Sequence, residues 1–261
     1  MIDFSKIKPI PLTQRYNKVT LKDIIPLDND IPVLENNDLK ELAERVVNAH
    51  KNKKQVIVMI GAHTIKVGLS LILIDLMKKG IITHIAMNGA SPIHDFEIAH
   101  QGATSEDVAK NIEDGSFGMA DETGWFVNEA IKEGAKDGIG AGKAIGRKIV
   151  ETDLRYVDYS ILGSAYKLNV PATVHIAIGC DIIHVHPNCD GASLGKASHD
   201  DFRIFTESVG KLEGGVVINI GSSVIMPEVF IKSLSAVRNL GFNVRNFTAA
   251  NLDMIRHYRP D

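Results

Sequence analysis

The sequence predicts an α/β protein with a doubly wound, mostly parallel sheet. Short β-branched runs alternate with helical patterns, and clusters of small or polar residues follow several of these runs. This alternation is typical of a Rossmann-like arrangement, and 261 residues suffice to bury its core. We expect an N-terminal arm and helix over residues 1–50, packed on a single main domain over residues 51–261.

Composition excludes several partners. The formal net charge of -3 provides no field that would attract nucleic acid or an anionic membrane. The N-terminus lacks the pattern of a signal peptide, and the longest apolar run, LSLILIDLM, is too short to span a bilayer. Two cysteines, Cys180 and Cys189, make no disulfide framework, and we therefore expect a cytoplasmic protein.

The elements follow one another in a regular order after an amphipathic helix predicted over residues 37–52. The predicted strands cover residues 55–61, 82–87, 171–179, 214–221 and 242–250, and residues 181–187 are strand-like or flank a turn. The predicted helices cover residues 64–80, 198–212 and 227–241, together with a segment capped by Ser91 and Pro92. Ser198 and Asp201 resemble a capping box. A helical, glycine-rich insert, which includes a helix at 104–112, occupies about residues 103–167.

Small or polar clusters fall at the predicted carboxyl ends of the strands, where open parallel sheets bind ligands. The clusters are residues 61–64, 88–90, 188–195, 221–223 and 248–250. Together they predict a groove for an extended, phosphate-bearing ligand held by backbone N–H groups and helix N-termini. Tight turns also favour small residues, so each single cluster has that simpler explanation.

Five stretches resemble deoxyhypusine synthase, a family with a sirtuin-like NAD-binding fold. They are residues 56–90, 94–102, 169–195, 216–234 and 242–253, the third containing NCDGASLG and the last reading FNVRNFTAANLD. The resemblance implies that NAD lies across the strand ends, often at a subunit interface, in a homo-oligomer (dimer or tetramer). It also implies an amine or polyamine substrate, which gives a hydride to NAD before an aminobutyl group passes through an enzyme lysine to a protein lysine.

The resemblance implies a set of NAD contacts by position. They are Thr64, Asn88, Gly89, Ala90, Asp190, Gly191, Ser193, Gly221, Ser222, Ser223, Thr248 and Asp253. Lys196 is the one lysine inside a matched loop, and it could contact phosphate or act as a displaced amine nucleophile, although a surface position is the simpler explanation. The first turn is about two residues shorter than in the family, and the run 226–228 replaces its polyamine-contacting histidine. The family's lysine-bearing segment is not seen, so aminobutyl transfer lacks its nucleophile unless the chain continues past residue 261.

An acid–base cluster follows the second predicted strand. On a helix, Glu97 lies three residues after His94, so the two could share a proton, with the histidine acting as a base near neutral pH. We therefore predict catalytic roles for His94, Asp95 and Glu97, which would handle protons or the charge of the substrate. Alternatively, the acids complement the helix dipole and His94 is their hydrogen-bonding partner.

Two other functions stay open. One is a nucleotide-binding module without catalysis. The other is a metal-dependent hydrolase that uses Cys180, His184, His186 and Cys189, although their spacing matches no established zinc pattern and we predict no metal site. We expect one of these histidines to point into the ligand cleft instead. The acids of residues 102–126, with Trp125, would suit a cationic substrate, but a solvated helix face explains most of them.

Overall fold

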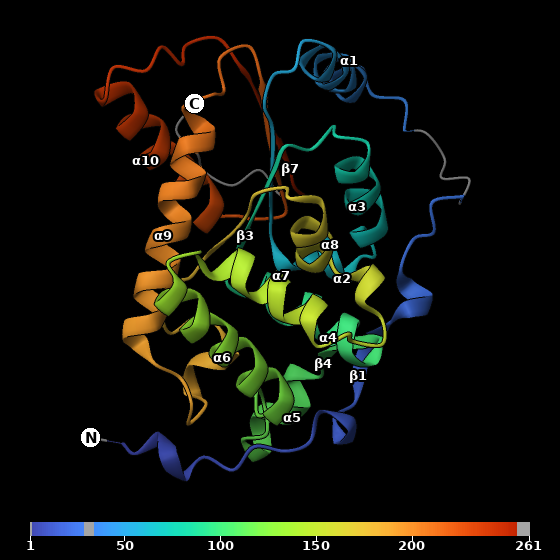
Figure 1. Ribbon diagram of the computed structural model, residues 1–261. Helices are drawn as coiled ribbons and strands as arrows, with labels where there is room; N and C mark the ends of the chain where they lie inside the picture. The colour runs from blue at the N-terminus through green and yellow to red at the C-terminus, as the bar shows by residue number, and fades with distance from the viewer. Residues whose placement is uncertain (1, 29–33, 255–261) are drawn as a thin grey trace.

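A five-stranded parallel sheet forms the centre of the computed structural model, which describes residues 2–28 and 34–254 (Figure 1). The strands are β2 (Val56–Ile60), β3 (His84–Asn88), β5 (Ala172–His175), β6 (Val216–Ile220) and β7 (Thr248–Leu252). Their order in the sheet is β5-β3-β2-β6-β7, so the chain winds outward first on one side of β2 and then on the other. This is the strand order of a Rossmann-like sheet, and the predicted fold class is confirmed.

Helices cover both faces of the sheet. The first face carries α1 (Asn37–Lys51), α3 (Ser70–Lys78), α4 (Ser91–Gln101), α7 (Ala141–Glu151) and α8 (Ile161–Leu168). The second face carries α9 (Gly191–Val209) and α10 (Ile225–Asn239). Two further helices lie near the carboxyl ends of the strands: α2 (Ala62–Lys66) packs against α4, and α6 (Asp121–Asp137) packs against α7 and α9. Within the described ranges, no helix combines the length and the apolar character needed to cross a membrane.

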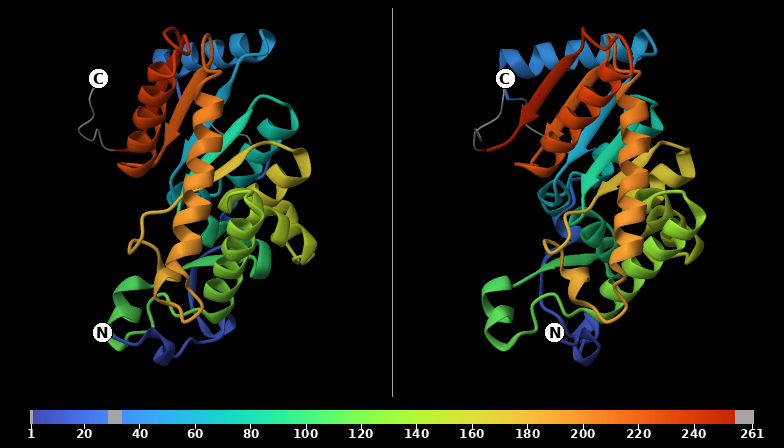
Figure 2. Two further views of the ribbon diagram at one scale, coloured as in Figure 1. Left: turned by 60° about the vertical axis from the view of Figure 1, so that its left-hand side comes forward. Right: turned by 90° about the vertical axis from the view of Figure 1, so that its left-hand side faces the viewer.

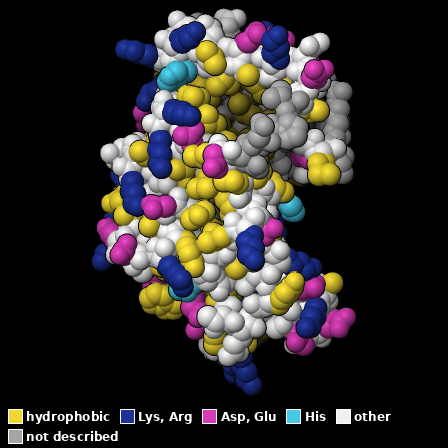
Figure 3. All heavy atoms as spheres, turned by 90° about the vertical axis from the view of Figure 1, so that its right-hand side faces the viewer, with side chains coloured by type: hydrophobic (Ala, Val, Ile, Leu, Met, Phe, Trp, Pro, Cys, Tyr) yellow, Lys and Arg dark blue, Asp and Glu magenta, His cyan; other side chains and the backbone are white. Residues whose placement is uncertain are grey.

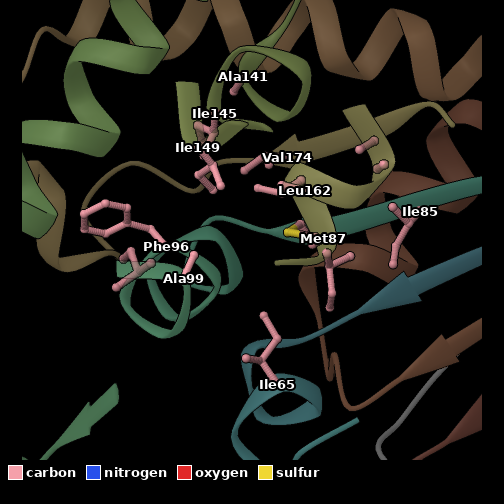
Figure 4. Packing of buried hydrophobic residues seen from close by; sticks show 14 of the residues in the cluster. Ile65, Ile85, Met87, Phe96, Ala99, Ala141, Ile145, Ile149, Leu162 and Val174 are labelled. Carbon is pink, nitrogen blue, oxygen red and sulfur yellow. The ribbon is translucent and has the colours of Figure 1, made fainter. Parts of the chain in front are cut away.

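Strand β2 shows why the sheet needs both layers. Val58 and Ile60 belong to the larger core under α3, α4, α7 and α8, whereas Ile57 and Met59 belong to the core under α9 and α10. Because both faces are covered, the strand is buried throughout and reads as a continuous apolar run. Figure 4 shows Met87 of β3 among side chains from α7 and α8 in the larger core.

The N-terminal arm forms a second, two-stranded sheet. Strand β1 (Asn17–Thr20) pairs antiparallel with β4 (Ala103–Glu106), and α5 (Val108–Asp114) follows β4. The predicted helix over 104–112 is therefore wrong in its first half. Thr104 and Glu106 are buried alternately along β4, and the pairing with an arm far away in sequence overrides the helical pattern.

Other predicted boundaries also move. The final strand starts at Thr248 instead of residue 242, and the strand-like run 181–187 contains a 3₁₀ helix, Ile182–Val185. The predicted capping box of Ser198 and Asp201 is wrong, because α9 starts at Gly191 and its N-cap is Asp190. Ser91 is the first residue of α4, and Ala90 occupies its N-cap position.

Two buried carboxylates cap helices that belong to other parts of the chain. Asp95 accepts hydrogen bonds from the backbone N–H groups of Ile161 at 2.7 Å and Leu162 at 3.1 Å, at the start of α8. Asp201 accepts from Gly142 at 2.9 Å, at the start of α7, and from Val174 of β5 at 2.8 Å. Burial raises the pKa of Asp95 to about 6 and that of Asp201 to about 8, although the donated hydrogen bonds act in the opposite direction.

The raised pKa of Asp201 predicts a pH-dependent stability. Its contribution is greatest below the ordinary aspartate pKa and is lost as pH rises toward about 8, because the folded state holds the proton more tightly than the unfolded state. Replacing Asp201 by Asn keeps an oxygen acceptor but removes the titration. We expect the free energy of unfolding of the wild type to be lower at pH 8 than at pH 5 by an amount on the order of a few kcal/mol. This difference should be absent from the variant.

Urea unfolding at pH 5 and pH 8 measures this difference. The exposed Asp158, replaced in the same way, serves as the control and should leave the pH dependence of the wild type unchanged. Equal pH dependence in the wild type and in Asp201→Asn would contradict the assignment.

Candidate functional site

The carboxyl ends of all five sheet strands lie at one edge. The topology reverses between β2 and β6, since the chain after β2 goes to the first face and the chain after β6 goes to the second. Ligands of open α/β sheets bind at such a switch point. In Figure 2, β2 and β7 point toward the part of the molecule that contains the N-terminal arm and α5. Figure 3 shows a recess in the outline between an upper and a projecting lower part of the molecule.

The switch point itself is tightly packed. A Cβ on Gly61 would lie 2.1 Å from the carbonyl oxygen of Gly221, so the turns after β2 and β6 touch through their backbones. Gly221 has a φ of +63°, a left-handed conformation that favours glycine. The hydroxyl of Thr64, a predicted NAD contact, donates to the carbonyl of Ile220 at 3.1 Å, and this residue is buried. The hydroxyl of Ser222 accepts from the N–H of Met226 at 3.3 Å at the start of α10.

At the end of β3, the loop after this strand meets the loop after β5 through a close contact of Gly89 with Asp181. The side chain of Asn88 accepts from the N–H and hydroxyl of Ser91 and so caps α4. Gly89 lies directly beneath Asp181, since a Cβ on this glycine would be 2.1 Å from Asp181 Oδ2. Asp181 comes from the loop after β5, so two predicted strand ends meet here.

Asp181 and His184 form a buried pair. His184 Nδ1 accepts from the backbone N–H groups of Gly179 at 3.0 Å and Asp181 at 3.3 Å, so the ring proton resides on Nε2. His184 Nε2 lies 3.9 Å from Asp181 Oδ2, too far for a hydrogen bond, and the two side chains are 6% and 5% exposed. Neither atom has a hydrogen-bond partner among the described residues.

This pair offers a ligand one acceptor and one donor. Burial raises the pKa of Asp181 to about 6 and lowers the pKa of His184. At neutral pH the carboxylate is therefore mostly ionised and the imidazole is neutral, with its N–H on Nε2. Buried polar atoms are normally paired, so these two unpaired atoms make the end of β3 the candidate site.

A second cluster lies where the arm meets α4 and β4. Arg15 contacts Glu97 at 2.6 Å and Glu106 at 3.6 Å, and all three side chains are buried. The hydroxyls of Thr104 and Thr123 also donate to Glu97, at 2.5 Å and 2.9 Å. Glu97 is therefore a saturated acceptor inside the protein.

His94 joins this cluster through Thr104. Its Nδ1 lies 2.7 Å from Thr104 Oγ1, and because Thr104 gives its proton to Glu97, His94 must be the donor. Burial, and then the charges of Lys66, Arg15 and His63, lower the pKa of His94 to about 3. His94 therefore reaches Glu97 through Thr104 and not directly, and its role as a base stays a prediction.

Sequence reasoning missed Arg15, Lys66 and Asp181. Lys66 is the last residue of α2 and is partly buried; burial lowers its pKa, while Glu97 and Glu106 oppose this. Lys66 lies only six residues after the end of β2, and this position near a carboxyl strand end could have identified it in the sequence. No local signal identifies Arg15, because its acidic partners lie more than 80 residues away in the sequence.

The remaining predicted residues lie apart from these two clusters. Asp190 caps α9, together with Ser193, and Gly191 is the first residue of that helix. The end of β5 meets α9 at Ser198, which accepts from the N–H of Ile176, about 12 Å along the helix axis from Asp190. Lys196 is exposed and pairs with Asp200 at 2.5 Å.

Two predicted contacts belong to β7. The placement of Thr248 at a carboxyl strand end is wrong, since it pairs with Val216 at the amino ends of β7 and β6. The cause is the shifted start of β7, which is set by pairing with β6. Asp253 follows β7 directly, at the carboxyl edge, as expected.

The four residues of the C-x₃-H-x-H-x₂-C pattern have separate surroundings. His186 Nε2 lies 2.8 Å from the carbonyl oxygen of Gly118, and Cys180 is exposed. Across residues 2–28 and 34–254, no three His, Cys, Asp or Glu side chains gather as a metal site would require. His184 is the histidine at the strand-end edge.

Comparisons with known proteins support the fold alone. No protein-family model and no curated protein matches the sequence. Among solved structures, the arginine dihydrolase ArgZ of cyanobacteria is 14% identical with a TM-score of 0.50, covering 84% of this chain and 30% of ArgZ. Unliganded AgrE is 14% identical with a TM-score of 0.51, covering 85% of this chain and 31% of AgrE.

The chain thus spans about 30% of the length of these two proteins. A proposed deoxyhypusine synthase from Entamoeba histolytica is 12% identical, with 76% of this chain and 78% of that protein covered. Its TM-score is 0.45, a likeness on which no argument rests. The resemblance to the deoxyhypusine synthase family therefore stays a prediction.

The buried cluster predicts a large effect for Arg15. Replacing it by Met leaves Glu97 and Glu106 buried without their cation, and we expect a loss of about 3–5 kcal/mol in the free energy of unfolding. Urea unfolding measures this loss. The matched control is Lys18→Met in the same arm, which removes an exposed pair with Asp107 and should cost less than about 1 kcal/mol. Equal losses in the two variants would contradict the role given to Arg15.

Proposed function

We propose that the carboxyl edge of the sheet binds a dinucleotide of the NAD type and that the protein uses it to oxidise an amine. The observation that carries this proposal is the unpaired pair of Asp181 Oδ2 and His184 Nε2 at the end of β3. The strand order supports it, because ligands of such sheets lie across the strand ends.

The donor set suits NAD. A buried carboxylate accepts hydrogen bonds from ribose hydroxyls or from an ammonium group, and an imidazole N–H donates to a carboxamide or hydroxyl oxygen. Gly61 and Gly89 allow the loops at these strand ends to pack closely on one another, which places Asp181 over the end of β3. When bound, NAD supplies the hydride acceptor. The polyamine class of substrate and the homo-oligomer belong to the same proposal and rest on the family resemblance.

Asp181 is suited to move the proton of this reaction. An amine R–CH₂–NH₃⁺ that loses a hydride from carbon and one proton from nitrogen becomes the iminium ion R–CH=NH₂⁺. Since the pKa of Asp181 lies at about 6, its carboxylate is ionised at neutral pH and near the optimum for accepting that proton. His184 would orient the substrate or the cofactor through Nε2–H.

The second cluster forms the structural wall of the site. Arg15 and two threonines saturate Glu97, so this acid holds the arm against α4 instead of exchanging protons. Lys66 is partly buried, which lowers its pKa, and it lies close enough to Glu97 and Glu106 for their charges to oppose this lowering.

Replacing Asp181 by Asn tests the proposal. The amide keeps the size of the side chain but cannot accept the proton, so we expect amine-dependent NADH formation to fall about 100- to 10,000-fold. NADH absorbance is followed with NAD⁺ and a panel of polyamines. The control variant Asp158→Asn, at an exposed position, should retain the wild-type rate.

The pH dependence gives a second test. Below about pH 6 the carboxyl of Asp181 is protonated and cannot act as a base, so the wild-type rate should fall as pH decreases through this value. The fall should be absent from the residual activity of Asp181→Asn. NAD⁺ binding without turnover of any amine would favour the non-catalytic module, and absence of NAD⁺ binding would reject the proposal.

A further inference from the structure

A large groove lies on the second face of the sheet, between α10 and the strands β6 and β7. Its volume is about 810 Å³, within the range of small-molecule sites. Met59 and Val217 form its floor, Phe230 and Leu234 come from α10, and Phe247 precedes β7. The groove exists because α10 packs against α9, β3 and β5, and so leaves β6 and β7 open on this face.

One residue that lines this groove has a buried polar atom without a partner among the described residues. Asn219, which lines it, is 4% exposed, and its Oδ1 has no hydrogen-bond partner among the described residues. The orientation of the amide is fixed, because Nδ2 donates at 2.9 Å to the backbone carbonyl of Ser222, which can only accept. The oxygen is therefore the end of the amide that lacks a partner among the described residues.

Asn251 places a donor beside this acceptor. Its Oδ1 accepts from Asn219 Nδ2 at 2.6 Å, so its own Nδ2 points away from Asn219. Asn251 also lines the groove, and the two residues are paired neighbours on β7 and β6. The groove thus combines an apolar floor, an acceptor and an adjacent donor. The rings of Phe230 and Phe247, with centroids 5.9 Å apart at 82°, add an aromatic wall.

We propose that this groove binds an aminopurine base, with adenine as the biological example. The exocyclic amino group would donate to Asn219 Oδ1, and an adjacent ring nitrogen would accept from Asn251 Nδ2. This is the pattern by which an amide side chain recognises adenine, here divided between two residues. The flat ring would lie against the apolar floor, where an aliphatic ligand would leave Asn219 Oδ1 unpaired.

The base has two possible sources. Three strand spacings, about 14 Å, separate β3 from β7, so the adenine end of an NAD molecule held by Asp181 could extend to the groove. A separate adenine nucleotide would carry the same base. The first source rests on the proposed function, whereas the recognition chemistry of the groove does not.

Calorimetric titration with adenosine and inosine tests the inference. Inosine carries an oxygen in place of the amino group. This oxygen is an acceptor and would lie opposite Asn219 Oδ1, which is also an acceptor. We expect adenosine to bind at least about tenfold more tightly than inosine. Asn219→Leu should abolish this preference, because it removes the acceptor.

Ser235→Trp tests the groove without touching the buried amide. Ser235 lines the groove and is exposed on α10, so an indole there fills the cavity and should abolish adenosine binding. The matched control is Asn239→Trp on the same helix, which is exposed outside the groove and should bind as the wild type does.

The outcomes separate this inference from the proposed function. Adenosine binding that survives Asp181→Asn while NAD⁺ is not bound would support the groove as a site for a separate nucleotide. Competition of NAD⁺ with adenosine would support the cofactor as the source. Equal binding of adenosine and inosine, or no binding of either while NADH formation persists, would overturn the inference. The inference would also be overturned if the wild type bound no adenosine and Ser235→Trp changed its oligomeric state in light scattering. That result would favour self-association through the groove.

Discussion

The buried contact of Arg15 with Glu97 and Glu106 is the interaction on which the shape of the strand-end edge depends. Moving three charges out of water is costly, and the cost is offset only because each group is also hydrogen-bonded. Arg15 contacts Asn17, and the backbone of Gly118 donates to Glu106. Since the three charged residues come from the arm, α4 and β4, their contact holds three separate segments against the edge of the sheet.

The remaining buried acids show why Asp181 is unusual. Asp95 and Asp201 accept hydrogen bonds from backbone N–H groups at the starts of α8 and α7, and Glu97 is saturated by its donors. Asp201 Oδ1 is also unpaired, but it lies against Gly140 between packed helices. Asp181 Oδ2 lies at the carboxyl end of a parallel strand, beside an unpaired imidazole N–H. A ligand that satisfied two such groups would stabilise the folded protein.

Much of the fold could be predicted from the sequence, and the reason is local. Buried parallel strands are β-branched runs, so Val56–Ile60 and Val216–Ile220 fall inside the predicted segments, and the glycines after them mark the turns. The start of α9 could not be found in this way, because Gly191 and Gly195 in its first turns disfavour a helix and the Asp190 cap compensates for them.

The site was less predictable because tertiary contacts assemble it. The run IIHVH suggested a strand, whereas its 3₁₀ turn places His184 beside Asp181, which lies over Gly89. Asn219 is hidden within an apolar strand, and its amide is oriented by hydrogen bonds to Ser222 and Asn251 that form only in the folded sheet. Asp95 and Glu97 follow β3 in the sequence, but their partners lie in α8 and in the arm, far away along the chain.

Hydrogen–deuterium exchange of the full chain, with and without NAD⁺, tests the central claim most directly. The account predicts that NAD⁺ slows exchange at the amides that follow β2, β3 and β6 and in the segment from Gly179 to His184, while α5 is unaffected. Unchanged exchange along this edge at saturating NAD⁺, or protection confined to other parts of the molecule, would contradict it.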